Sequence, residues 1–100
     1  MAKKNSMIFQ NKEVNPNDWR LWKGQGEAAS ASEQFPYMAF IPCEGITSNT
    51  SGLQVEFDTN DPTITAFAPF AETVDGGINI FANRQLAKTI IIPQIVCDRN

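Results

Sequence analysis

Apolar and polar positions are most regularly ordered in the last quarter of the chain, where they predict two β-strands around a short polar turn. In residues 76–83 an apolar side chain recurs at every second position from Ile78 onward. Residues 89–97 are apolar on both faces, because Ile91 points away from the isoleucines on either side of it. We therefore expect a closing hairpin whose second strand either lies centrally in a sheet sandwich or packs its second face on a neighbouring subunit.

Earlier stretches carry similar signals. Residues 53–58 alternate strictly between apolar and polar side chains, which is typical of a half-buried strand, and residues 35–43 are apolar enough to cross the core. Residues 27–34 hold only small and polar side chains, so we expect a loop there with at most one helical turn. Weaker strands are predicted at residues 7–9, 19–23 and 63–67, followed by an irregular link that buries Phe70.

Strands of this number and spacing, without an amphipathic helix, predict an all-β fold. We expect a small antiparallel β-sandwich or jelly-roll-like module with a flexible N-terminal arm. The expected division is an arm over residues 1–9 and a single β domain over residues 10–100. No stretch is long and apolar enough to cross a membrane, and the first residues lack the apolar core of a signal peptide, so we expect synthesis in the cytoplasm.

The expected arm combines basic and apolar side chains, which suit attachment to another surface. We expect it to anchor the chain on a larger particle through Lys3, Lys4, Met7, Ile8 and Phe9.

Charge is distributed very unevenly. Residues 24–83 contain eight acidic residues and neither lysine nor arginine, although the net charge of the chain is only −3. An acidic body repels phosphate backbones, so we expect no nucleic-acid partner. The basic arm could meet the acidic body of an adjacent copy, and a small inhibitor that mimics nucleic acid is one alternative function.

Few side chains suit catalysis or metal binding. The chain has no histidine, which excludes imidazole bases and mixed Cys/His zinc sites. Cys43 and Cys97 are expected to be buried free thiols. Asp58, Asn60 and Asp61 form an oxygen-rich turn but lack the full ligand set of a calcium loop. We therefore expect a protein that is not an enzyme and uses no cofactor.

Two tryptophans lie close together near the N-terminus. Trp19 and Trp22 favour packing in the core or at a subunit interface, and the alternative is a carbohydrate-binding module for host-surface glycans that uses these rings or Tyr37 as platforms. The residues expected at a subunit interface are Trp19, Trp22, Phe81, Ile91 and Val96.

A longer pattern runs through residues 35–97. Its parts are Phe35-Pro36-Tyr37, Glu44-Gly45-Ile46-Thr47, the alternating residues 53–58, Glu72-Thr73, residues 76–82 and Ile90-Ile91-Ile92-Pro93. This order resembles the small structural proteins of tailed-phage virions, which include fibre, tail-tip and head-decoration modules. The resemblance implies a compact β module that acts on the virion as an oligomer, often a trimer, and binds itself and other virion proteins.

Overall fold

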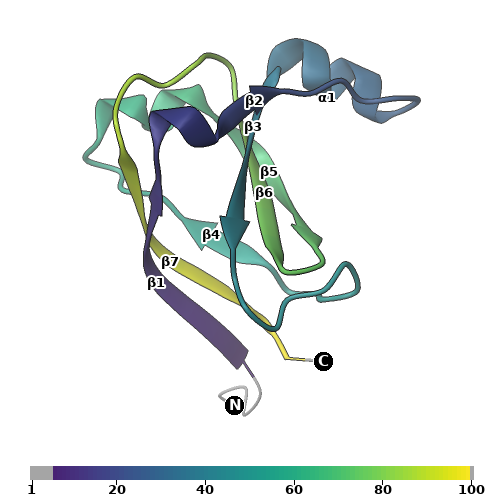
Figure 1. Cartoon of the computed structure of the whole chain (residues 1–100), viewed down its shortest axis with the longest axis vertical. Coiled ribbons are helices and arrows are strands. Elements are labelled where there is room, and N and C mark those ends of the chain that lie inside the picture. The colour runs from purple at the N-terminus through teal and green to yellow at the C-terminus, as the bar shows by residue number, and fades with distance from the viewer. Residues whose placement is uncertain (1–5, 100) are drawn as a thin grey trace.

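The computed structural model describes residues 6–99, and the chain is mostly β, as predicted (Figure 1). Its strands form two antiparallel sheets, in the orders β1-β7-β4 and β2-β3-β6-β5. The strands are β1 (Ser6–Val14), β2 (Trp19–Leu21), β3 (Tyr37–Pro42), β4 (Gln54–Glu56), β5 (Phe67–Val74), β6 (Gly77–Ala82) and β7 (Ile90–Asp98). One α-helix, α1 (Ala28–Gln34), and two 3-10 helices (Pro16–Asp18 and Pro62–Ala66) complete the described chain, in which no helix is long and apolar enough to cross a membrane.

The expected closing hairpin is wrong, although both of its strands exist. β6 lies between β3 and β5 in one sheet, whereas β7 lies between β1 and β4 in the other. The connection at residues 83–89 crosses from one sheet to the other, and its one large apolar side chain, Leu86, is buried in the core. Burial of Leu86 draws this connection over the end of the core, so the inward faces of β6 and β7 meet across it. β7 is the middle strand of its own sheet, but its outer face, which carries Ile91, is not covered within the described chain.

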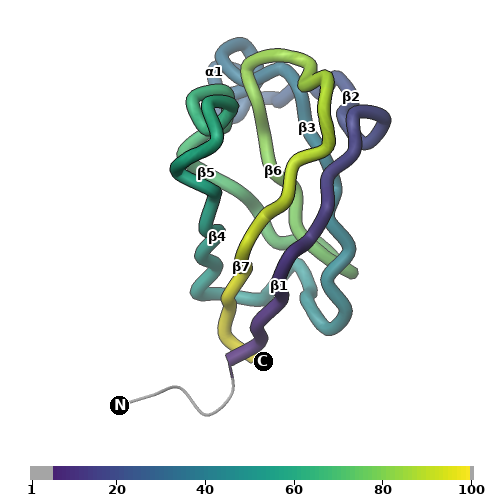
Figure 2. Tube along the Cα trace, turned by 90° about the vertical axis from the view of Figure 1, so that its left-hand side faces the viewer, coloured from purple at the N-terminus to yellow at the C-terminus, as the bar shows by residue number. Residues whose placement is uncertain are grey.

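The N-terminal strand pairs with β7 along its whole length, from Ser6 opposite Asp98 to Val14 opposite Ile90. The two strands lie side by side in Figure 2. Residues 6–9, which the sequence assigned to an arm, are therefore part of a sheet, and residues 1–5 lie outside the described residues.

The core lies between the two sheets and is built mainly from isoleucine. Its largest fully buried side chains include Ile41, Ile78 and Ile80 from one sheet and Ile92 and Ile95 from the other. Cys43 and Cys97 are both free and buried, as predicted, and burial raises the pKa of both thiols.

Two local predictions differ from the structure. The small and polar stretch before Phe35 forms helix α1, and the buried Ser32 hydroxyl joins it to the preceding loop, because it accepts a hydrogen bond from the Gly24 N–H while donating one to the Ala29 carbonyl. The strand expected at residues 63–67 is a 3-10 helix that begins at Pro62, and β5 starts only at Phe67. Both helices are stabilised by single polar side chains, which leave no periodic signal in the sequence.

Candidate association surfaces

The outer face of the three-stranded sheet exposes two isoleucine side chains. Ile8 lies directly opposite Val96 and is 58% exposed, and Ile91 is 43% exposed on the same face. Between them lie the amides of Gln10 and Gln94, joined by a side-chain hydrogen bond of 3.5 Å. We call Ile8, Ile91 and Val96 the isoleucine face. It brings together three residues that the sequence singled out for anchoring or subunit contact.

An irregularity in both strands creates this face. Ile91 and Val96 are five residues apart, so in a regular strand they would point to opposite sides of the sheet. Here Pro93 and Gln94 interrupt the alternation of buried and exposed residues, and on β1 the interruption falls at Asn11, which has a φ of 55°. Asn11 and Pro93 are the residues that the pairing of β1 with β7 leaves out, between the Gln10/Gln94 and Lys12/Ile92 pairs, so both strands switch alternation at the same place. The switch places Ile91 and Val96 on one surface.

Two of the five expected anchoring residues point into the molecule. Met7 is buried and Phe9 is partly buried against the core, because strand alternation turns both toward the opposite sheet and only Ile8 outward. Met7 and Phe9 are thus core residues of β1, and Lys3 and Lys4 lie outside the described residues.

The outer face of the four-stranded sheet carries an aromatic cluster of Trp22, Phe35, Phe70 and Phe81. Ring centroids are 4.8 Å apart for Trp22 and Phe81, 5.2 Å for Phe70 and Phe81, and 5.7 Å for Phe35 and Phe70. The Trp22 indole N–H donates to the Phe35 carbonyl at 2.6 Å. Trp22 and Phe81 do meet, but Phe81 is covered by its neighbours and offers no interface of its own.

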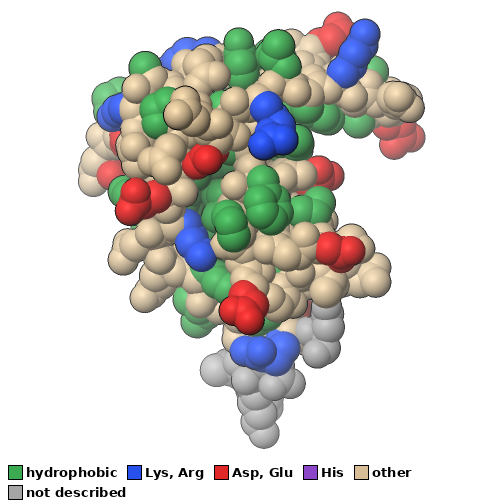
Figure 3. All heavy atoms as spheres, viewed as in Figure 1, with side chains coloured by type: hydrophobic (Ala, Val, Ile, Leu, Met, Phe, Trp, Pro, Cys, Tyr) green, Lys and Arg blue, Asp and Glu red, His purple; other side chains and the backbone are tan. Residues whose placement is uncertain are grey.

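Phe70 is the exposed member of this cluster. The sequence placed it in a buried link, yet it is 40% exposed on the edge strand β5. A separate group of apolar side chains, on a side of the molecule away from β5, lies in the middle of the face that Figure 3 shows. Exposure of Phe70 depends on the position of β5 at the end of its sheet, which no local pattern encodes.

Trp19 is a core residue rather than an interface residue. It is buried on the inner face of β2, with its ring centroid 6.1 Å from that of Phe67. Tyr37 lies on the same inner face, since it is opposite the buried Ala82. Trp19 and Trp22 therefore occupy opposite faces of the sheet and form no common platform for a sugar, which removes the main geometric support for the glycan-binding alternative.

A third surface lies where the two sheets part. A cleft of about 520 Å³ opens between β4 and β5, with residues of apolar type along its walls, and we call it the β4–β5 cleft. It is lined by Leu53, Val55, Phe57, Ile64, Phe67, Ala68, Pro69, Phe70 and Ala71. Phe57 and Phe67 stack at 4.5 Å and connect the two sheets at this edge.

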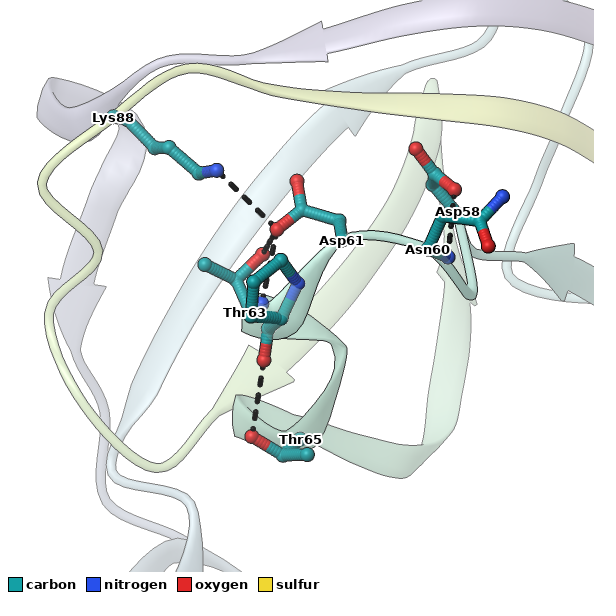
Figure 4. A network of polar contacts seen from close by, with 7 residues as sticks. Asp58, Asn60, Asp61, Thr63, Thr65 and Lys88 are labelled. Carbon is teal, nitrogen blue, oxygen red and sulfur yellow. Dashed lines mark hydrogen bonds and ion pairs between the residues drawn. The ribbon is translucent and has the colours of Figure 1, made fainter.

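The acidic turn after β4 uses its side chains to hold its own backbone (Figure 4). Asp58 accepts a hydrogen bond from the Asn60 N–H at 2.9 Å. Asp61 accepts from the Thr63 N–H at 2.9 Å and from the Thr63 hydroxyl at 2.7 Å, and its carboxylate lies 3.3 Å from the Lys88 ammonium. Among residues 6–99 no group of three or more acidic or cysteine side chains is placed to hold a metal ion. The turn thus caps a 3-10 helix and ties it to the connection between β6 and β7.

This cap predicts a pH dependence. The hydrogen bonds from Thr63, assisted by Lys88, hold the pKa of Asp61 below its usual range. A carboxyl group with a lowered pKa in the folded state stabilises that state above its unfolded pKa, and this stabilisation is lost as the pH falls through the folded pKa. We expect Asp61→Asn to flatten the loss of stability below about pH 4, measured as the urea midpoint across an acid series. Thr63→Val, which keeps the carboxylate but removes the hydroxyl donor, should give an intermediate slope. Identical slopes in all three proteins would contradict the cap.

Comparison of the chain with protein-family models, with curated proteins and with solved structures finds no match. The functional argument therefore rests on the geometry of these surfaces.

Proposed function

We propose that this chain is a non-enzymatic structural protein of a tailed-phage virion: a β-sandwich module that associates with copies of itself, as a trimer, on a larger particle. The isoleucine face is the observation that carries the proposal. The resemblance of residues 35–97 to virion modules supports it as well, and the two packed sheets are compatible with a sandwich.

The outer face of an antiparallel sheet is ordinarily polar when it faces water. On the isoleucine face, Ile8 and Ile91 expose large side chains instead. Gln10 and Gln94 lie between them, and Glu13 and Glu56 lie opposite Ile91 and Gln94 at the border of the face. Interface centres are depleted of charge, and exposed apolar patches mark association sites. A patch repeated on identical chains favours closed symmetric assembly, which supports a homo-oligomer.

Light scattering tests the assembly. We expect a mass three times the 11.1 kDa of one chain, equal at low and high salt because an apolar contact is not screened. The double variant Ile8→Lys, Ile91→Lys should be a monomer, since burying two ammonium groups would oppose association. Leu21→Lys, which changes a 70% exposed side chain outside the isoleucine face, should remain trimeric. A monomeric parent protein at working concentration would overturn the assembly.

A truncated chain tests attachment in the same experiment. Because β1 begins at Ser6, a chain that starts at Ser6 keeps the sheet intact, whereas a start at Gln10 would remove half of β1. We expect the chain from Ser6 to keep its mass in solution but to lose incorporation into particles, since Lys3 and Lys4 are absent. Unchanged incorporation would refute attachment through these residues.

A further inference from the structure

The hydrophobic core is incomplete at the β4 edge. Phe9, Ile95 and Val55 face inward in one row across β1, β7 and β4. Ile95, in the middle strand, is fully buried, but Val55 is only partly buried. β4 is the last strand of its sheet, so among the described residues no further strand pairs beside Val55. The inward side chains of β4 are thus left open to the β4–β5 cleft.

The two strands that border the cleft are not equally suited to pair with an additional strand. β5 contains Pro69, which lacks an N–H donor, and its register with β6 is interrupted between Phe67 and Ala71. Such features discourage pairing at a sheet edge. β4 has neither, and its pairing with β7 is regular from Gln54 to Glu56. An incoming strand would therefore extend the three-stranded sheet beside β4.

The acidic residues around this edge favour basic side chains in the incoming strand. The outward residues of β4 are Gln54 and Glu56, both exposed, and Asp58 follows. Lys88 is engaged by Asp61 at 3.3 Å. A residue placed opposite Glu56 would lie on the outer face, where a lysine or arginine forms a favourable cross-strand pair. A residue placed opposite Val55 would point into the cleft, which favours an apolar side chain.

We propose that the β4–β5 cleft binds an extended peptide segment that adds as a strand beside β4. Its apolar side chains enter the cleft at every second position, and basic side chains opposite Glu56 alternate with them. This is β-strand addition, in which main-chain hydrogen bonds supply affinity and pockets for alternate side chains supply specificity. The inference that the segment belongs to another protein of the same particle rests on the proposed function. The inference that the cleft binds an apolar and basic strand does not depend on that function.

The test is a titration of the full chain with fluorescein-labelled octapeptides, followed by anisotropy. We expect saturable binding of a peptide of alternating lysine and valine, and binding about tenfold weaker, equal to 1.4 kcal/mol, for alternating glutamate and valine. Alternating lysine and serine should also bind about tenfold more weakly, because it leaves the cleft unfilled. Equal binding of the lysine–valine and lysine–serine peptides would reduce the interaction to charge alone and overturn the proposal.

Charge reversal locates the site on the protein. Glu56→Lys should weaken binding of the lysine–valine peptide and strengthen binding of the glutamate–valine peptide, a swap that an unfolded variant could not produce. Glu27→Lys makes the same change at the start of α1, well away from β4 in Figure 1, and should alter neither affinity. Equal effects of the two substitutions would place the peptide elsewhere.

Two further outcomes would also overturn the inference. One is the absence of saturation up to about 1 mM peptide. The other is a fall in the light-scattering mass of the parent chain when saturating lysine–valine peptide is added, which would show that the peptide displaces a second copy of the chain from the cleft. The peptide titration does not depend on the isoleucine face, so it can fail while the trimer stands, and the trimer can fail while the peptide binds.

Discussion

Replacement of Ile95 by alanine is expected to lower the free energy of unfolding by about 2–5 kcal/mol. Ile95 lies in the middle of β7, the central strand of its sheet, and is fully buried. Its neighbours across the sheet, Phe9 and Val55, belong to strands paired on both sides of β7, so they cannot close around the space that the lost atoms leave. The measurement is urea unfolding followed by tryptophan fluorescence.

Leu21→Ala is the matched control for this substitution. It removes the same number of carbon atoms from a side chain that is 70% exposed, so the expected change is within about 0.5 kcal/mol. Similar losses for Ile95→Ala and Leu21→Ala would contradict the placement of Ile95 at the centre of the core.

Substitution of Gly77 by alanine is expected to destabilise the fold by about 3 kcal/mol, at the upper end of the usual effect of overpacking. Gly77 begins β6 opposite Pro42 on β3. A Cβ atom there would collide with the Ile41 carbonyl oxygen and lie 2.9 Å from carbons of the Phe40 ring. The ring can move, but the carbonyl oxygen belongs to the backbone of β3, so relief requires the two strands to separate.

The neighbouring Gly76 separates this packing effect from backbone strain. Gly76 has a φ of 90°, and an added Cβ would meet nothing closer than the Phe40 ring at 3.9 Å. Gly76→Ala should therefore lose only the about 1–2 kcal/mol of a left-handed conformation. Urea midpoints that rank Gly76→Ala as the more damaging change would contradict the close approach of β3 and β6.

Strand positions were predictable because alternation is local, but strand partners were not. The pattern around Ile78 and around Ile91 marks which side chains point inward, and it holds whichever strand lies next to each stretch. The crossover that replaces the expected hairpin carries Leu86, a single apolar residue in a polar connection, which is buried in the core. A single apolar residue forms no periodic pattern, so its burial becomes evident only when the core has formed.

The sequence identified large apolar residues that could form the candidate surfaces, but it did not show which of them are exposed. Trp19, Trp22 and Phe81 were grouped as interface residues, because large aromatic side chains favour interfaces and cores alike. The structure buries Trp19 in the core, covers Phe81 with other rings and exposes Phe70 instead. Alternation separates the two faces of a strand, but exposure on a face depends on whether another element covers it.

The sequence by itself determined that the chain is β, which isoleucines share a strand face in residues 78–80 and 90–92, and that Cys43 and Cys97 lie inside, since these follow from side-chain hydrophobicity and a period of two. Only the tertiary structure decided that Ile91 joins Val96 on one face and that the core stays open beside Val55. The first required the paired irregularity at Asn11 and Pro93, and the second required β4 to be the last strand of its sheet. Both depend on which strands lie side by side, and contacts between distant segments fix that arrangement only when the two sheets pack.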